Sequence, residues 1–204
     1  MFRSQSSGRD RLDPTLADRV PPGQYVTEKF PVLHYGEVPR YRDLATTWDL
    51  RIWGEIAAPR RFDFAEFRAL PTTTVITDIH CVTRWSKLDT RWEGVAFRSL
   101  LEMLEPLKPT AQHVLFHCEQ GYTANVPLSV MLDPNALLAY RFEGAELTPE
   151  HGYPLRSLVP GKYFWKSAKW LRGIEFLSED RLGFWERYGY HNDADPWREE
   201  RYAD

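Results

Sequence analysis

The chain has 204 residues, which is enough for one domain with a substantial buried core. Its 43% hydrophobic and 27% charged residues are typical of a soluble globular protein, and a net charge of -3 gives no reason to expect nucleic acid or an acidic membrane surface as a partner. Two cysteines cannot form a disulfide framework, and no apolar run is long enough for a membrane span. Since the N-terminus contains no apolar signal-peptide core, we expect a cytoplasmic protein with reduced thiols.

The chain reads as one domain with a polar beginning. Residues 1–25 are rich in Ser, Asp and Pro and predict a flexible N-terminal lead-in. Residues 26–204 contain no repeat, no low-complexity segment and no internal boundary, so we expect a single domain there. The tail GFWERYGYHNDADPWREERYAD is aromatic and charged, and its pattern indicates no chemical role.

Strands are expected to outnumber helices. Alternating or β-branched apolar residues predict strands within residues 47–56, 72–81, 111–119, 125–132, 136–144 and 170–176. Two short helices are predicted over residues 63–70, where Asp63 and Glu66 have the spacing of a capping box, and over residues 94–104. Because strands and helices do not alternate regularly, the predicted fold class is a mixed, strand-rich α+β domain.

Cys81 ends a predicted strand, and Arg84 and Lys87 follow it closely in the sequence. Neighbouring cations lower the pKa of a thiol, which suits a metal ligand or a nucleophile. A nucleophilic cysteine also needs a positioned base, and the sequence does not say which histidine would meet it. The candidate bases are His80, His117 and His151.

Two His-Cys pairs, at residues 80–81 and 117–118, together resemble a zinc site of two cysteines and two histidines. Successive side chains of a strand face opposite sides of the sheet, however, and neither pair has the spacing that zinc sites favour. We therefore do not expect structural zinc. The residues around Cys118 predict a small buried side chain at the end of an apolar strand.

Residues 151–176 form a basic, aromatic segment interrupted by Gly and Pro. Loops of this kind bring backbone N–H groups close to anions, and nearby cations add charge, so the segment predicts phosphate binding. The alternative is a solvated basic face. Neither a GxxxxGK[ST] loop nor a GxGxxG motif is present, so common nucleotide-binding folds are not indicated.

Three stretches point to a known family. LLAYRFEGAELTPEHGYPLRSLVPGKYFWKSAKWLRGIEF, residues 137–176, contains His-Gly-x-Pro-x-Arg followed by Pro-Gly and Lys-Trp. Cys81 is followed by an arginine and by WEGVAFRSLLE, and residues 121–128 read GYTANVPL. In this order they resemble the molybdopterin-binding domain shared by sulfite oxidases, assimilatory nitrate reductases and the bacterial methionine sulfoxide reductase catalytic subunit.

The resemblance implies an oxidoreductase of the sulfite oxidase fold with a molybdenum–molybdopterin cofactor. In that family a cysteine thiolate is the protein's bond to molybdenum, and Cys81 has that position. A soft sulfur donor suits such an ion. The resemblance also implies that Tyr122, as a hydrogen-bond donor or proton carrier, and Arg84 line the substrate pocket. It implies cofactor contacts at His34, Cys118, His151, Arg156, Ser167, Ala168 and Lys169.

The sequence also departs from the oxidases. Val32 stands where the oxidases have an arginine that contacts the substrate oxyanion, and CVTRWS replaces their Cys-Ala-Gly-Asn-Arg-Arg after the cysteine. These departures argue against sulfite as the substrate. No haem or flavin module of the kind found in these relatives is recognised, so we expect a separate redox partner protein.

We therefore expect a cytoplasmic molybdopterin-dependent oxidoreductase that transfers an oxygen atom between water and a small sulfur- or nitrogen-containing substrate. Two alternatives remain. One is a cofactor-free binding or scaffold domain that kept the fold, which the retained cysteine and basic segment disfavour. The other is a hydrolase with Cys81 as the nucleophile, which no specific feature of the sequence indicates.

Overall fold

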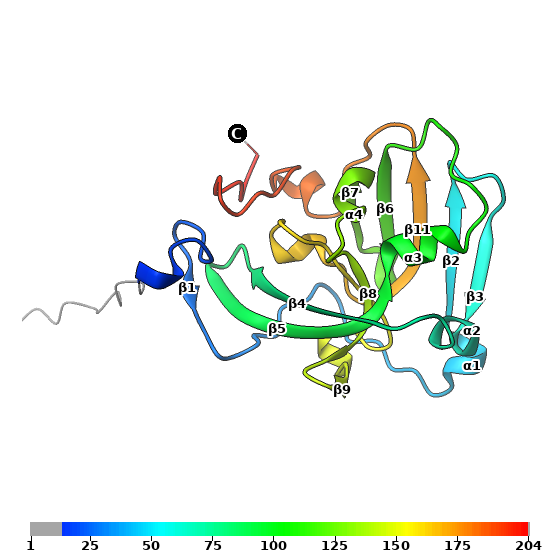
Figure 1. The fold of residues 1–204 in the computed structure, drawn as a ribbon, viewed down its shortest axis with the longest axis horizontal. Helices are drawn as coiled ribbons and strands as arrows, with labels where there is room; N and C mark the ends of the chain where they lie inside the picture. Colours follow the sequence, from blue (N-terminus) through cyan, green and yellow to red (C-terminus); the bar gives the residue numbers. More distant parts are fainter. Residues whose placement is uncertain (1–13, 204) are drawn as a thin grey trace, which may run out of the picture.

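The computed structural model describes residues 14–203. Two β-sheets pack against each other, the helices are short, and the C-terminal segment lies to one side of the sheets (Figure 1). The predicted strand-rich α+β class is therefore confirmed. None of the helices in the described part of the chain is long and apolar enough to cross a membrane.

The first sheet has six strands and contains the longest strand described, β5. Its central order is β1-β5-β8-β10, while β4 pairs with β5 and β9 pairs with β8. All of these pairs are antiparallel except β1 with β5. The strands are β1 Tyr25–Val26, β4 Thr73–His80, β5 Trp85–Ala96, β8 Leu137–Phe142, β9 Ala145–Glu146 and β10 Arg156–Leu158.

The second sheet has five strands in the order β3-β2-β11-β6-β7. Only the pair β2 and β11 is parallel. The strands are β2 Asp49–Gly54, β3 Arg60–Asp63, β6 His113–Cys118, β7 Thr123–Pro127 and β11 Leu171–Leu177.

The helices connect strands and are no longer than two turns. The α-helices are α1 Leu44–Thr47, α2 Phe64–Arg68, α3 Phe97–Glu102 and α4 Leu128–Met131. Short 3-10 turns are η1 Pro14–Leu16, η2 Glu119–Gly121, η3 Pro149–His151, η4 Phe164–Lys166 and η5 Glu186–Tyr188. At α2 the predicted capping box is confirmed, because Asp63 accepts from the Glu66 backbone and Glu66 accepts from the Asp63 backbone.

The main core lies between the two sheets. Because alternate residues of a strand face opposite sides, Val95 and Leu138 of the first sheet meet Phe116 and Ile174 of the second in one buried cluster. The opposite face of the first sheet buries a smaller cluster around Trp92. Both faces of this sheet are thus covered, and a slip of one residue would exchange them, so the register that positions its strand ends is strongly fixed.

The structure corrects two predicted boundaries. The strand expected over residues 125–132 ends at Pro127, and Leu128–Met131 form α4, because the chain turns away where β7 runs out of partners on β6. The helix expected over residues 94–104 begins only at Phe97, because residues 94–96 still pair with β8. The part of β5 before these residues was not predicted as a strand.

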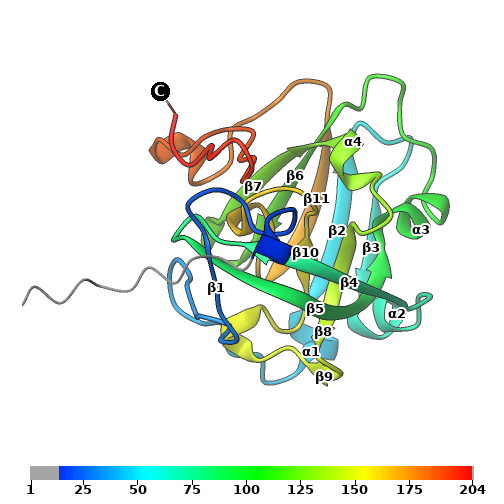
Figure 2. The ribbon, with the colours of Figure 1, turned by 60° about the vertical axis from the view of Figure 1, so that its left-hand side comes forward.

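The expected flexible lead-in has two parts. Residues 1–13 lie outside the described residues. From Pro14 on, the chain packs on the first sheet, where β1 lies beside the start of β5 (Figure 2). The Arg19 guanidinium also bonds Asp78 and Asp89. Residues 14–25 are thus held in place by backbone pairing and by ion pairs.

Candidate functional site

A cavity of about 240 Å³ opens where β4 ends. Its walls come from connecting segments rather than from the middle of strands. The lining residues come from the stretches 30–35, 81–85, 151–156 and 164–170, of which Val32, Arg84, residues 152–155 and Lys166 do not face the cavity, together with Tyr122, Trp185 and Tyr190. Segments far apart in sequence therefore converge on one space, which is typical of a ligand site.

Cys81 is placed in this cavity by a tight turn. Its backbone N–H donates to the Trp85 carbonyl over 2.8 Å, and the Arg84 N–H donates back to the Cys81 carbonyl. The thiol is only 7% exposed and accepts a bond from the Thr83 hydroxyl over 3.2 Å. Burial raises the pKa of the thiol, while the Thr83 bond and the Arg201 charge lower it. A metal ion would replace the thiol proton.

The structure does not bring Arg84 into the cavity. Its backbone has a φ of 78°, which turns the exposed side chain towards Gly23, and Lys87 instead donates to the Glu28 carbonyl. The cation whose charge lowers the Cys81 pKa comes from the C-terminal segment, at Arg201. The expected role of Arg84 in the pocket therefore has no support in this geometry.

Three basic residues, Arg156, Lys169 and His151, line the cavity. Arg156, the first residue of β10, is 1% exposed and donates to the carbonyls of His151 and Ser167 over 2.9 and 2.8 Å. Its guanidinium also lies over the ring of Phe164, at 4.3 Å from the centroid. Among the described residues, neither Arg156 nor Lys169 forms an ion pair with a carboxylate. The nearby Glu150 charge acts on Lys169 and His151 without a direct bond to either, so these groups have no bonded counter-charge.

The pKa values of these groups report the same imbalance. Burial lowers the pKa of Arg156 to about 9. Burial and then the Arg156 charge lower the pKa of Lys169 to about 7, and the same two causes, with Lys169, lower that of His151 to about 4. His151 is also stacked on Phe30, with ring centroids 3.9 Å apart. An anionic ligand would relieve all three shifts, because it favours the charged forms.

The segment that carries Lys169 is braced against β10 by two hydroxyls. Ser167 accepts from the Val159 N–H over 2.9 Å, and the Ala168 N–H donates to Ser157 over 2.7 Å. The Ser157 N–H donates in turn to the Ala168 carbonyl. The Ser167 hydroxyl is thus engaged in holding the loop, while the loop as a whole faces the cavity.

Tyr122 follows η2 and lines the cavity from the other sheet. Its hydroxyl donates to the Trp165 carbonyl over 2.7 Å, and burial raises its pKa well above the usual value of 10.0. The hydroxyl is therefore neutral, and its proton is directed at the protein backbone. His34 also lines the cavity, with Nδ1 at 2.9 Å from the Gly36 carbonyl.

Cys118 differs from the expectation of a cofactor contact. It is buried in the main core rather than along the cavity, and its N–H donates to the Tyr122 carbonyl. Burial raises the pKa of this thiol strongly. The prediction of a small buried side chain at a strand end is the one that fits. Apart from Arg84 and Cys118, every predicted site residue lines the cavity.

Several lining residues were missed by sequence reasoning. The aromatic residues Trp165, Trp185 and Tyr190 line the cavity, and the last two come from the tail for which no role was predicted. The only sequence signal for them is the density of aromatic residues around Gly183 and Gly189.

The two alternative chemistries find no support in the described residues. No group of three or more metal-binding side chains of His, Cys, Asp or Glu occurs there. The Cys81 thiol is bonded by Thr83, whereas His80 contacts Ser86 and His117 contacts Glu175. Of the candidate bases only His151 shares the cavity with Cys81.

Comparisons with known proteins agree with this geometry. The oxidoreductase YuiH of Bacillus subtilis is 50% identical over 91% of this chain and 92% of its own length. The sulfite oxidase of Arabidopsis thaliana is 29% identical, with 81% of this chain matched to 51% of that protein. The methionine sulfoxide reductase catalytic subunit MsrP of Campylobacter jejuni is 28% identical over 73% of this chain and 57% of its own.

The fold is shared with a solved structure. The sulfane dehydrogenase SoxCD from Paracoccus pantotrophus superimposes with a TM-score of 0.62 at 18% identity, covering 93% of this chain and 58% of that one. A family profile described as the oxidoreductase molybdopterin binding domain matches residues 35–185. The uncompensated cations beside a buried thiol suit the anionic pterin and its metal. The chain thus belongs to this family and is a molybdopterin-dependent oxidoreductase that uses the molybdenum cofactor.

Proposed function

We propose that this protein transfers an oxygen atom between water and a small sulfur- or nitrogen-containing substrate, and exchanges electrons with a separate partner protein. The observation that supports this most directly is that the Cys81 thiol shares a cavity with Arg156 and Lys169, two basic groups that form no ion pair with a carboxylate in the described residues. Two of the similar proteins have names that describe subunits of methionine sulfoxide reductases, which favours a separate electron-transfer partner here.

Each side chain has a distinct task in this proposal. Cys81 would bind the molybdenum through its thiolate, and the Thr83 hydroxyl would stabilise the sulfur charge. Arg156, Lys169 and His151 would contact the anionic pterin, and the loop at Ser167 and Ala168, whose backbone groups bond within the protein, would hold Arg156 and Lys169 in position towards it. His34 would close this side at the rim.

When bound, the cofactor supplies the oxygen exchange and takes up or releases two electrons. Tyr122 bounds the remaining space, where its hydroxyl oxygen can accept a hydrogen bond while its O–H donates to the Trp165 carbonyl. The aromatic side excludes water from the reacting atoms, which strengthens the electrostatic effect of the cations. Reduction of an S-oxide or N-oxide consumes two electrons and two protons and releases water, and the reverse reaction balances equally.

The test is metal and pterin analysis of protein purified from a host that makes molybdopterin, with Cys81→Ser as the variant and Cys118→Ser as the matched control. We expect near-stoichiometric molybdenum in the native protein and in Cys118→Ser. In Cys81→Ser we expect a folded protein that has lost most of the metal and all turnover, because oxygen replaces the soft sulfur ligand.

Two results would overturn the assignment. Retained turnover in Cys81→Ser would remove Cys81 as the metal ligand. A native protein with neither pterin nor metal would instead favour a scaffold domain that kept the fold. We also propose a cytoplasmic location, in keeping with two free cysteines, and immunodetection in cytoplasmic against exported fractions tests it.

A further inference from the structure

The C-terminal segment, residues 183–203, forms one side of the cavity. Figure 1 shows this segment as a separate coil beside β7, away from the core between the sheets. It is attached at its start, where the Phe184 N–H donates to the Thr123 carbonyl over 2.8 Å. From there it contributes Trp185 and Tyr190 to the cavity lining.

These two rings pack into a group with Trp165. The centroids of Trp185 and Tyr190 lie 5.1 Å apart, and Tyr190 meets Trp165 edge to face, also at 5.1 Å. Trp165 is stacked in turn on Tyr163, with an interplanar angle of 15°. Aromatic contacts of this kind hold the rings in fixed positions. Trp165, Trp185 and Tyr190 therefore form a preformed aromatic wall of the cavity.

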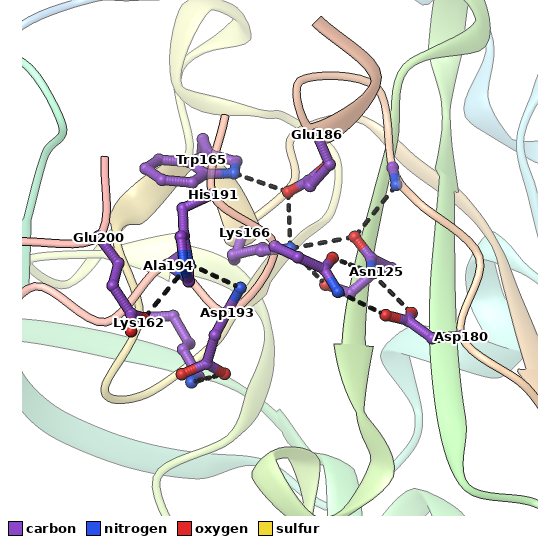
Figure 3. Close-up of polar contacts among 12 residues, drawn as sticks. Asn125, Lys162, Trp165, Lys166, Asp180, Glu186, His191, Asp193, Ala194 and Glu200 are labelled. Carbon is purple, nitrogen blue, oxygen red and sulfur yellow. Dashed lines mark hydrogen bonds and ion pairs between the residues drawn. The ribbon is translucent and has the colours of Figure 1, made fainter. Parts of the chain in front are cut away.

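A buried ion pair anchors the segment (Figure 3). Lys166 Nζ lies 2.6 Å from Glu186 Oε1, and both side chains are 1% exposed. The same carboxylate oxygen accepts from Trp165 Nε1 over 2.8 Å, while Lys166 also donates to the carbonyl and side-chain oxygens of Asn125. Glu186 thus connects the tail both to β7 and to the lining residue Trp165.

Further contacts extend this anchor along the tail. The Asn125 side-chain amide donates to Asp180 and to Asn192, and Asn192 donates to Asp180 (Figure 3). The Gly183 N–H donates to the Asn125 side-chain oxygen, and a Cβ at Gly183 would lie 2.5 Å from Glu186 Oε2. The glycine therefore lets the tail approach the ion pair closely.

The family profile ends at residue 185, so Glu186, Tyr190 and Asn192 lie beyond the part of the chain that the family has in common. The basic residues of the lining are His34, His151, Arg156 and Lys169, and none comes from the tail. No Asp or Glu lines the cavity in the described residues. The tail therefore contributes aromatic, uncharged side chains to the lining, whereas the basic side chains come from other segments.

We infer that Trp185 and Tyr190 are specificity-determining residues that pack against an apolar or aromatic body of an uncharged substrate, and that the Lys166–Glu186 pair holds them in position. The inference rests on the proposed function, since the cofactor would occupy the cationic side and leave the aromatic side for the substrate. A small oxyanion would gain nothing from this wall, because flat apolar rings offer it no hydrogen-bond donors apart from the Tyr190 hydroxyl and the Trp185 N–H.

Calorimetric binding of methyl phenyl sulfone, a neutral aromatic probe, and of sulfate to the purified, molybdenum-loaded full chain tests the inference. We expect the sulfone to bind the native protein about tenfold more tightly than sulfate does. Trp185→Ala and Tyr190→Ala should each weaken sulfone binding about tenfold, whereas Trp185→Phe, which keeps a ring, should stay within about threefold. Trp197→Ala is the control, since this tail residue is 44% exposed and does not line the cavity.

The molybdenum content of every sample separates the two proposals. If Trp185→Ala or Tyr190→Ala keeps the native metal content but binds the sulfone more weakly, the result supports a specificity role. The retained metal content then excludes a loss of fold as the cause. Sulfate that binds as tightly as the sulfone, or a Trp185→Ala protein with unchanged sulfone affinity, overturns the inference. A native protein without molybdenum overturns the proposed function alone, because the loss of sulfone affinity in Trp185→Ala and Tyr190→Ala can still be measured without the sulfate comparison.

The variant Glu186→Gln tests the Lys166–Glu186 ion pair separately from the rings. The amide keeps the shape of the side chain but leaves the Lys166 charge without a partner, so we expect sulfone affinity to fall as far as in Trp185→Ala. The paired change Lys166→Met with Glu186→Leu removes both charges and should restore part of the affinity. An unchanged affinity in Glu186→Gln would show that the ring packing alone holds the wall.

Discussion

At Lys169, burial and the charge of Arg156 act in the same direction, and they lower the pKa of the amine to about 7. About half of these side chains are then uncharged at neutral pH, although the ordinary lysine is almost fully protonated. The nearest backbone partner, the Glu150 carbonyl at 2.6 Å, accepts a bond but supplies no negative charge. A bound anion would favour the charged amine and raise its pKa again.

This leads to a prediction about reactivity. In the cofactor-free protein at pH 7.5, Lys169 should react with an amine-acylating reagent faster than the other lysines, because only the uncharged amine is nucleophilic. In the loaded protein the labelling of Lys169 should fall by about tenfold or more, through its raised pKa and through cover by the ligand. Peptide mass spectrometry with timed labelling measures both rates, and Lys108, half exposed beside Glu55, is the internal control. Equal labelling of Lys169 in both forms would contradict an anion at this site.

At the scale of residues, the sequence could indicate the type of site but not its full lining. Cys81, His151 and Arg156 stand in a recognisable order along the chain, and the structure brings them together. Arg84 could not be judged, because a positive φ at that residue decides where its side chain points. The contribution of Arg201 to the Cys81 site depends on a contact across 119 residues, between its guanidinium and the Val82 carbonyl.

Among the elements, β5 shows why local signals are insufficient. It forms a hairpin with the preceding β4 but also pairs with β1 and β8, so part of its stability comes from two partners that are distant in sequence. By contrast the capping box of α2 was predictable, since Asp63 and Glu66 are three residues apart and satisfy each other's backbone groups. The boundary between β7 and α4 depends on where pairing with β6 ends, which the sequence of that segment does not reveal.

Gly94 provides a test of how closely these strands approach. The pairing of β5 with β8 is irregular between Glu93 and Gly94, and a Cβ at Gly94 would lie 2.7 Å from the Ala139 Cα and even nearer to the Leu138 carbonyl oxygen. These are backbone atoms, which cannot rotate away. We expect Gly94→Ala to lower the free energy of unfolding by about 3 kcal/mol or more, measured by urea denaturation.

The matched control is Gly121→Ala. Gly121 has a φ of 76° but no heavy atom within 4 Å of its added Cβ, so only the backbone conformation is penalised. We expect a loss of about 1 kcal/mol there. Similar losses at both glycines would mean that β5 shifts away from β8 without difficulty, against the register described for this sheet.

At the scale of the whole molecule, the site forms where strand ends of both sheets meet the segment before α1 and the C-terminal segment. The first sheet carries Cys81 and Arg156 at strand ends, and the second carries Tyr122 after β6. The segment before α1 is fixed across this gap, because the Glu37 N–H donates to the Gln120 side chain over 2.8 Å. Such a site is assembled only when the complete domain folds, so its stability and its ligand affinity are linked.

This linkage gives opposite expectations for stability with and without the cofactor. In the cofactor-free protein, Lys169→Met removes a desolvated cation that faces Arg156, so its unfolding temperature should equal or exceed that of the native protein. On loading, however, the rise in unfolding temperature should be smaller than in the native protein, since every tenfold loss of affinity removes about 1.4 kcal/mol of stabilisation at saturating ligand. Scanning calorimetry on both forms measures the two effects, with the exposed Lys29→Met as the control for charge. A full rise on loading in Lys169→Met would show that this lysine contributes nothing to anion binding, and the cationic side of the cavity would then depend on Arg156 and His151 alone.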